Sequence, residues 1–333
     1  MIRHIKIENY KGIANAEFDI RPLTILTGLN STGKSTCFQS VLTSLYYSDP
    51  LSTTLLEDLD YSFDTLRNRN TNAQALSISI TCDSGEIGCE INRDKGEGYN
   101  TAQKVLESNI YYLWANRLGY TEMETISPKY NIGIAGEYIF GTFEKEKSNP
   151  VSSKLQIVKE SETLSSHLNY WLSYILGIKF EMQTERVTPN KAKVIYKSDD
   201  LANLSPQQLG VGVSYLAKIL IMCLRAKEGD VIMIENPEIH LHPAAQSKLG
   251  EFFAYIVNAG IQVLLETHCE HLISRLQYEV FKNRLTPDKI VLYYKASITD
   301  DFIRINFNSN GKFETEFPEG FFDATLDELL EME

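Results

Sequence analysis

The residues with the clearest chemistry lie in GLNSTGKS (28–35), which fits the pattern G-x-x-x-x-G-K-[ST] at every fixed position. Its glycines allow the backbone to wrap a phosphate with N–H groups, and the helix predicted to follow adds a favourable field. Lys34 is expected to reach the β- and γ-phosphates, and Ser35 to offer its hydroxyl to Mg²⁺. A turn that only links a strand to a helix would need the glycines but not the Lys-Ser pair, so the motif predicts a nucleoside triphosphate site. The predicted nucleotide contacts are Gly28, Asn30, Ser31, Thr32, Gly33, Lys34, Ser35 and Thr36.

A second group of polar residues follows the apolar run VIMIE (231–235) and reads NPEIHLHP. A carboxylate at the end of a buried strand is how nucleoside triphosphatases place an acidic oxygen beside Mg²⁺. We therefore expect Glu235 to be the acid on the Mg²⁺ side. Glu238 is either a carboxylate near a helix start or a general base, and the sequence leaves both interpretations open.

The elements around these motifs are predicted to alternate between strands and helices. In the first half, the apolar pattern predicts a helix over 33–47 and strands at 2–8, 16–20, 23–27, 76–80, 86–91 and 110–115. In the second half, it predicts helices at 212–226, from 243 and from 268, and strands at 231–235, 262–266 and 289–294. This alternation indicates an α/β fold, with a mixed N-terminal β lobe and a parallel core sheet covered by helices.

A weaker pattern separates the two halves. Residues 117–200 contain one amphipathic helix at 161–176 and a hairpin-like pair at 179–197. We therefore expect three domains, which are an N-terminal lobe with the phosphate loop (1–116), a helical and hairpin insertion or lid, and a C-terminal lobe (201–333).

The composition limits the class of protein. With 43% hydrophobic residues among 333, the chain can bury a sizeable core. Its net charge of −12 has the wrong sign for a protein that coats nucleic acid through a general basic surface. This charge does not exclude a local basic groove. We see no secretory leader and no run of about 18 uncharged apolar residues, so we expect a cytoplasmic protein that does not contact membranes. Five scattered cysteines are expected to be reduced and mostly buried.

The motifs, in their order along the chain, resemble those of ABC-type ATPases of the RecF/SMC/OLD group. The matching segments are the N-terminal strands, GLNSTGKST, LGVGVSYL, MIENPEIHLHP and LLETHCEHL, and they cover roughly 1–45 and 200–333. Standalone AAA-family ATPases with an IENPE strand end and a PEGFFD-like tail are particularly similar. The resemblance implies an ABC-type P-loop ATPase head that uses ATP and Mg²⁺, with Glu235 as the metal-side acid.

The same resemblance assigns roles around the acidic strand end. Asn236 stands where the group usually has the catalytic glutamate, and an amide cannot accept a proton from water. His268 matches the switch histidine that contacts the γ-phosphate, and HLHP (240–243) matches a loop that crosses a dimer interface. Zinc is an alternative reading of the histidines, but spacing alone does not show that they converge. The histidines with such spacing are His240, His242, His268 and His271.

A third match is the signature segment LGVGVSYL, where Gly210 and Gly212 hold small-residue positions and Ser214 substitutes for the usual serine. In the group, this segment contacts the γ-phosphate held by a second subunit. One phosphate loop and one signature per chain therefore imply a head-to-tail homodimer with ATP between the subunits. Arg117 resembles an arginine near the site of related ATPases, and the alternative is an exposed arginine in a surface salt bridge.

Three functions are compatible with these motifs. The leading one is a slowly hydrolysing dimeric switch or sensor for an effector protein, which the resemblance places in bacterial anti-phage defence. A RecF-like repair ATPase would clamp DNA with an affinity that falls with salt, and a non-hydrolysing ATP-bound scaffold would explain Asn236. No long coiled coil and no Toprim nuclease domain are expected. The acidic tail GFFDATLDELLEME (320–333) either docks on a protein or packs on its own domain.

Overall fold

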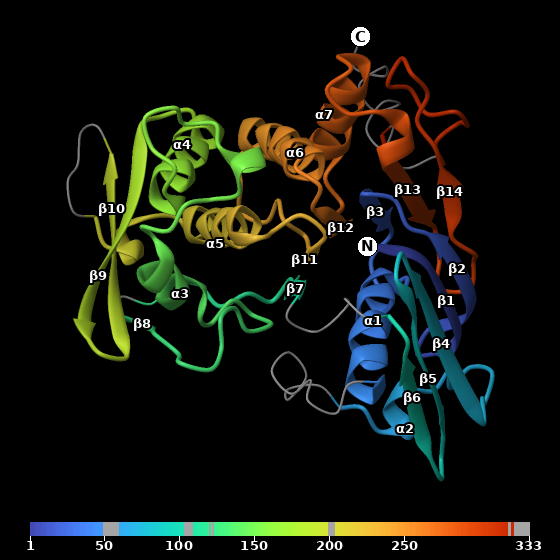
Figure 1. The fold of residues 1–333 in the computed structure, drawn as a ribbon. Coiled ribbons are helices and arrows are strands. Elements are labelled where there is room, and N and C mark those ends of the chain that lie inside the picture. The colour runs from blue at the N-terminus through green and yellow to red at the C-terminus, as the bar shows by residue number, and fades with distance from the viewer. Residues whose placement is uncertain are drawn as a thin grey trace.

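A six-stranded sheet forms the centre of the computed structural model, in the order β14-β13-β3-β12-β11-β7 (Figure 1). All pairs are parallel except the pair of β13 with the edge strand β14. The strands are β3 (Leu23–Gly28), β7 (Ile110–Leu113), β11 (Val231–Glu235), β12 (Gln262–Glu266), β13 (Ile290–Lys295) and β14 (Ile303–Ile305). The structure describes residues 1–48, 60–102, 109–119, 121, 123–198, 204–318 and 321–322.

The central strands are buried along their whole length because both faces of the sheet are covered. Side chains that alternate along a strand enter two different cores. In β11, for example, Val231 and Met233 face one core, and Ile232 and Ile234 face the other. This explains why VIMIE reads as a continuous apolar run rather than as an alternating one.

One core lies between the central sheet, a helix and an antiparallel sheet of five strands in the order β2-β1-β4-β5-β6. The helix α1 (Lys34–Ser48) contacts strands of both sheets and contributes Phe38, Val41 and Leu42 to this core. The strands are β1 (Ile2–Tyr10), β2 (Ile13–Asp19), β4 (Ala75–Cys82), β5 (Gly85–Asn92) and β6 (Gly96–Asn100), with the short helix α2 (Phe63–Leu66) beside them.

The other core joins the opposite face of the central sheet to the remaining helices (Figure 1). These are α3 (Ile139–Glu146), α4 (Leu164–Leu176), α5 (Val211–Arg225), α6 (Pro243–Asn258) and α7 (Glu270–Phe281). A small antiparallel sheet in the order β8-β10-β9 covers the far side of α3 and α4. Its strands are β8 (Met123–Thr125), β9 (Phe180–Thr188) and β10 (Lys191–Ser198). Among the described residues, 3₁₀ turns lie at Ser153–Leu155, Pro206–Gln208 and Pro287–Lys289.

The predicted fold class is confirmed, and the element boundaries differ from the expected ones by only a few residues. The helix expected from 161 begins at Leu164, because the side chain of Thr163 accepts the N–H of Ser166 and caps it. The helix expected from 268 begins at Glu270, where Cys269 is the cap. All five cysteines are buried free thiols, as expected. The division into three domains stays a prediction, since helices of the 117–200 segment share one core with α5 and α6.

The acidic tail lies mostly outside the described residues. Of its apolar side chains, Phe321 and Phe322 pack against Phe313 and Phe317, so these two contact their own domain. Leu326, Leu329 and Leu330 are not described. Within the described part of the chain, no helix is long and apolar enough to cross a membrane.

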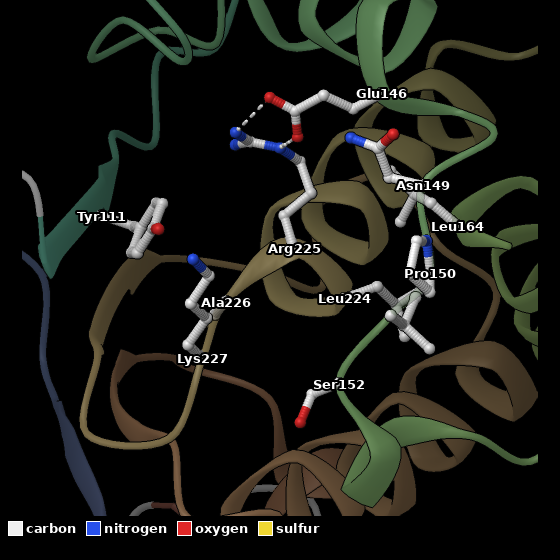
Figure 2. A pocket seen from close by; sticks show the side chains of 11 residues that line it. Tyr111, Glu146, Asn149, Pro150, Ser152, Leu164, Leu224, Arg225, Ala226 and Lys227 are labelled. Carbon is white, nitrogen blue, oxygen red and sulfur yellow. Dashed lines mark hydrogen bonds and ion pairs between the residues drawn. The ribbon is translucent and has the colours of Figure 1, made fainter. Parts of the chain in front are cut away.

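A pocket of about 670 Å³ marks the place where the inserted segment meets the core sheet. Figure 2 shows Arg225, at the end of α5, in a two-bond ion pair with Glu146 of α3, with N···O distances of 2.7 and 3.0 Å. Tyr111 of β7 lines the same pocket. A bidentate pair of this kind fixes geometry as well as charge, so it anchors α3 to α5.

The side chain of Gln262, fully buried at the start of β12, joins the central six-stranded sheet to the five-stranded sheet. Its Oε1 accepts the backbone N–H of Ile2 (2.8 Å), and its Nε2 donates to the carbonyl of Ile2 (2.8 Å). A leucine of similar size would leave both backbone groups buried without a partner. We expect Gln262→Leu to lower the free energy of unfolding by about 2–4 kcal/mol in urea denaturation.

The matched control for this change is Gln74→Leu, because Gln74 is exposed and donates only to the local carbonyl of Asn72. We expect it to change the free energy of unfolding by less than about 0.5 kcal/mol. Equal effects of the two substitutions would contradict the structural role given to Gln262.

Candidate active site

The phosphate loop connects the end of β3 to the first turn of α1, as the motif predicts. Three of its residues have positive φ, namely Gly28 (131°), Ser31 (61°) and Gly33 (94°). At Gly28, a Cβ atom would lie 2.0 Å from the carbonyl oxygen of Lys295, so the neighbouring strand β13 leaves room for glycine alone. The tight pairing of β3 with β13 therefore fixes where the loop starts.

Lys34 is folded back onto the loop, with only 3% of its surface exposed. Its ammonium group donates to the carbonyls of Gly28 (3.2 Å) and Leu29 (2.5 Å). Burial lowers its pKa, and the nearby carboxylate of Glu266 opposes that change. These carbonyls hold the cation at the centre of the loop, where a phosphate would be cradled.

A pocket of about 280 Å³ lies against this loop. Six of the eight predicted nucleotide contacts line it, while Gly28 and Asn30 do not. The other lining residues are Gly12, Gln39, Glu266 and Ile298. The lining residues from the motif are Ser31, Thr32, Gly33, Lys34, Ser35 and Thr36.

Glu235, predicted to face Mg²⁺, does not line this pocket. Its carboxylate is 2% exposed and turned toward β7, where the hydroxyl of Tyr112 donates to Oε1 (2.6 Å) and the N–H of Ala115 donates to Oε2 (3.1 Å). Burial raises the pKa of Glu235, and these two hydrogen bonds act against the rise. Both of its oxygens are thus already used within the protein.

The carboxylate that does line the phosphate pocket is Glu266, at the end of β12, which the sequence analysis did not single out. It is 6% exposed, and its Oε2 has no hydrogen-bond partner. Its pKa is raised to about 7, mainly by burial; a hydrogen bond from Ser35 opposes the rise, and the charge of Glu235 adds to it. The signal was present in the sequence, because QVLLE is also an apolar run that ends in an acid.

Asn236 follows Glu235 in a left-handed backbone conformation, with φ of 42°. Its N–H donates to the carbonyl of Glu266 (2.6 Å), and its Oδ1 is buried without a partner. Asparagine is among the few residues other than glycine that adopt this conformation readily. The residue type at 236 therefore agrees with the sharp turn by which the chain leaves the sheet.

Glu238 and His268 lie together just beyond the two strand ends. Oε1 of Glu238 accepts the backbone N–H of His268 (3.1 Å), and Oε2 of Glu238 is buried without a partner. Burial raises the pKa of Glu238. The ring of His268 lies near Gly28 and Lys34, where lost hydration and the Lys34 charge lower its pKa. The structure thus brings the predicted histidine to the phosphate loop.

Arg117 is 3% exposed, so the interpretation as an exposed, salt-bridging arginine is wrong. Its Nη2 donates to the backbone carbonyls of Glu235 (2.7 Å) and Asn236 (2.6 Å). The carbonyl of Arg117 in turn accepts the hydroxyl of Tyr215 on α5 (3.0 Å). Burial lowers the pKa of Arg117 to about 10, and Glu238 opposes the shift. Arg117 therefore connects the acidic strand end to the predicted signature helix.

The predicted signature residues lie at the start of α5 and differ in their surroundings. Gly210 is exposed with open space around it, whereas Gly212 is buried against the carbonyl of His240. Ser214 is fully buried, and its hydroxyl lies 3.3 Å from that of Tyr196. Ser214 therefore faces the core, where Tyr196 of β10 packs against α5.

The remaining histidines have local environments that differ from one another. His242 caps α6, since its Nδ1 accepts the N–H of Ala244 (3.2 Å), and His240 and His271 are exposed. In the described part of the chain, no group of three or more His, Cys, Asp or Glu side chains converges as a metal site.

The contact between Gly212 and the HLHP loop gives a direct test of this geometry. A Cβ atom at Gly212 would lie 2.3 Å from the carbonyl oxygen of His240. We expect Gly212→Ala to lower the free energy of unfolding by about 1–3 kcal/mol, measured by chemical denaturation. The control is Gly210→Ala, which has open space and a φ of −63° and should change stability by less than about 0.5 kcal/mol. If both variants were equally stable, this packing would be wrong.

A solved-structure comparison finds the same fold in two heads of Smc proteins. One is the Smc head bound to the C-winged helix domain of ScpA, with a TM-score of 0.55 at 12% identity over 92% of this chain and 97% of that chain. The other is the Smc head domain with an extended coiled coil bound to the C-terminal domain of ScpA derived from Pyrococcus furiosus, with a TM-score of 0.55 at 10% identity over 99% of both chains. At such identities the likeness shows the fold, which is that of an ABC-type ATPase head.

Sequence comparisons agree with this fold. The energy-coupling factor transporter ATP-binding protein EcfA2 of Streptococcus sanguinis (strain SK36) is 28% identical over 86 residues, which are 26% of this chain. The match spans only 30% of that relative. A family model described as "AAA domain, putative AbiEii toxin, Type IV TA system" matches residues 93–274. Because this match covers more than half of the chain, the protein belongs to that AAA domain family of ATPases and has the fold of the Smc heads.

Proposed function

We propose that this protein binds ATP with Mg²⁺, hydrolyses it slowly, and acts as a dimeric switch that passes its nucleotide state to a protein partner. The observation that carries the proposal is the phosphate pocket, where the loop amides, Lys34, Ser35 and an unpaired buried carboxylate oxygen converge. A phosphate in this pocket would replace the carbonyls of Gly28 and Leu29 as the partners of Lys34. The helix start at Lys34 adds the field that favours an anion.

The residues of the pocket fit Mg²⁺. This ion is usually held in nucleotide sites by one or two side-chain oxygens together with phosphates, so a cage of three protein ligands is not needed. Ser35 would hold it, in keeping with its place directly after Lys34 in the motif. When bound, Mg²⁺ neutralises phosphate charge and orients the γ-phosphate.

Slow hydrolysis is proposed because Asn236 cannot take a proton from water. Glu238 supports the alternative of a displaced general base. Its Oε1 accepts the backbone N–H of His268, the histidine near the phosphate loop. Its Oε2 has no hydrogen-bond partner in the protein. Burial raises the pKa of this carboxyl toward the range in which a base works well near neutral pH.

A head-to-tail homodimer is proposed from the positions of the two halves of the site. The pocket at the start of α5 is lined by Gly210, Gly212 and His240, among others, and shares no residue with the phosphate pocket. A nucleotide site that uses both surfaces would therefore need a second copy of the chain to complete it. Such a closed dimer would also change the environment of Arg117, which joins α5 to the strand end.

A protein partner is proposed from the family description, which names a putative toxin of a type IV toxin-antitoxin system. The net charge of −12 favours a protein partner over nucleic acid. We further propose that this pairing serves bacterial defence against phage.

Turnover of ATP tests the first part of the proposal. We expect the wild type to release phosphate slowly with Mg²⁺, Lys34→Ala to fall to the background, and Glu238→Gln to lose about 100-fold or more because the proton acceptor is removed. The measurement is steady-state phosphate release by the purified chain.

A different result would reassign the function. If the wild type released no more phosphate than Lys34→Ala, while Asn236→Glu gained activity, the protein would be an ATP-held scaffold and the proposed hydrolysis would be wrong.

The oligomeric state tests the second part. We expect Glu238→Gln with ATP and Mg²⁺ to sediment as a dimer, because ATP stays intact between the subunits. We expect Lys34→Ala to sediment as a monomer under the same conditions, since it cannot hold the phosphates. Analytical ultracentrifugation with and without ATP measures this. An ATP-independent dimer of Lys34→Ala would contradict the sandwich.

A further inference from the structure

We propose that the acidic tail, residues 323–333, docks on the exposed face of α7 in the same chain. This interaction is independent of the proposed ATP site, because the face contains none of the residues assigned to that site. Of the two interpretations of the tail that the sequence leaves open, it favours packing on the tail's own domain over docking on another protein.

The exposed face of α7 is a stripe of residues at helical spacing. Ser274, Tyr278, Phe281 and Lys282 are exposed, and Arg275 is half-buried. Residues three and four apart lie on the same side of a helix. Tyr278 is 43% exposed and Phe281 is 54% exposed, and their ring centroids lie 6.3 Å apart. The described part of the chain thus leaves two large aromatic side chains uncovered next to each other.

Three cations surround these two rings. The guanidinium carbons of Arg275 and Arg284 lie 5.4 and 5.8 Å from the ring centroid of Tyr278. The ammonium nitrogen of Lys282 lies 5.4 Å from the same centroid and 5.6 Å from that of Phe281. The aromatic pair is therefore part of a basic surface.

Two carboxylates balance only part of this charge. Glu279 is buried and pairs with Arg275 (2.8 Å) and Arg284 (2.7 Å), while Glu251 pairs with Arg275. Together with Lys282, three cations face two carboxylates, so the face is positive although the whole chain has a net charge of −12. Such a face suits a segment that combines carboxylates with apolar side chains.

The tail has this chemistry. Five of its eleven residues are Asp or Glu, and none is Lys, Arg or His. Its leucines, Leu326, Leu329 and Leu330, have the three- and four-residue spacing of an amphipathic segment. On the α7 face, leucines would cover Tyr278 and Phe281, and the carboxylates would lie near the surrounding cations.

The tail also starts close to α7. Phe322, the last described residue, packs on Phe313 with ring centroids 5.7 Å apart. The turn before Phe313 lies against α7, because a Cβ atom at Gly311 would lie 2.2 Å from the carbonyl oxygen of Gln277 and 3.1 Å from Cβ of Phe281. Eleven extended residues span about 36 Å. The twelve residues of α7 are about 18 Å long, so the tail can reach along the helix.

Hydroxyl-radical footprinting of the full chain without nucleotide, read by mass spectrometry, measures whether the face is covered. The internal reference for Tyr278 is Tyr170 on α4, which has the same side chain and is 40% exposed. We expect Tyr278 to be oxidised about 3-fold or more slowly than Tyr170, because the docked tail removes it from water.

A tail variant identifies what covers the face. Leu326, Leu329 and Leu330 are replaced by serine in the full chain, which changes no described residue. We expect oxidation of Tyr278 to rise about 3-fold or more, to the rate of Tyr170, because the apolar contacts are lost. The control is Val187→Ser, which replaces a 53% exposed apolar side chain on β9 and should leave the oxidation of Tyr278 unchanged.

Three results would overturn the docking of the tail on its own chain. Equal oxidation of Tyr278 and Tyr170 in the wild type would mean that the face is free. Slow oxidation of Tyr278 that persists in the tail variant would mean that another segment covers it. Protection of Tyr278 that disappears on dilution would assign the face to the tail of a second copy.

Discussion

The site depends on the parallel pairing of β3, β12 and β11, which brings two acids to the same edge of the sheet. Glu235 and Glu266 are register partners on neighbouring strands, and both are buried. Two carboxylates so placed repel each other unless the protein stabilises the negative charge. The structure stabilises one of them, Glu235, with the hydroxyl of Tyr112 and a backbone N–H. The two acids thus differ in their surroundings, since Glu235 is hydrogen-bonded toward β7 and Glu266 lines the phosphate pocket.

The same edge is connected to the helix that carries the predicted signature residues. Arg117 donates to the two carbonyls at the end of β11, and its own carbonyl accepts from Tyr215 on α5. The guanidinium also lies over the ring of Tyr215, at 5.5 Å from its centroid. The planar fork of the guanidinium thus holds two carbonyls and lies over a ring at the same time. Arg117 therefore links the end of β11 to α5 through short contacts.

The fold and the phosphate loop could be predicted from the sequence because their signals are local. The apolar runs of the core strands and the spacing in GLNSTGKS need no knowledge of distant residues. The direction of a side chain at the end of a strand is different. Whether Glu235 or Glu266 faces the loop depends on which strand lies beside β3, and that order is set by the tertiary fold. The burial of Arg117 and of Ser214 could not be predicted for the same reason, since each contacts a tyrosine elsewhere in the chain, Tyr215 and Tyr196, 98 and 18 residues away.

The asparagine after Glu235 follows from these constraints. Its backbone is left-handed, its N–H is fixed by the carbonyl of Glu266, and its carbonyl is held by Arg117. This turn directs the chain from the sheet into the segment that presents Glu238 to His268. A longer, acidic side chain at 236 would carry the cost of the left-handed backbone and would add a third carboxylate beside Glu235 and Glu266. Asparagine avoids both costs, and the carboxylates of this region come from the strand ends, Glu235 and Glu266, and from the following loop, Glu238.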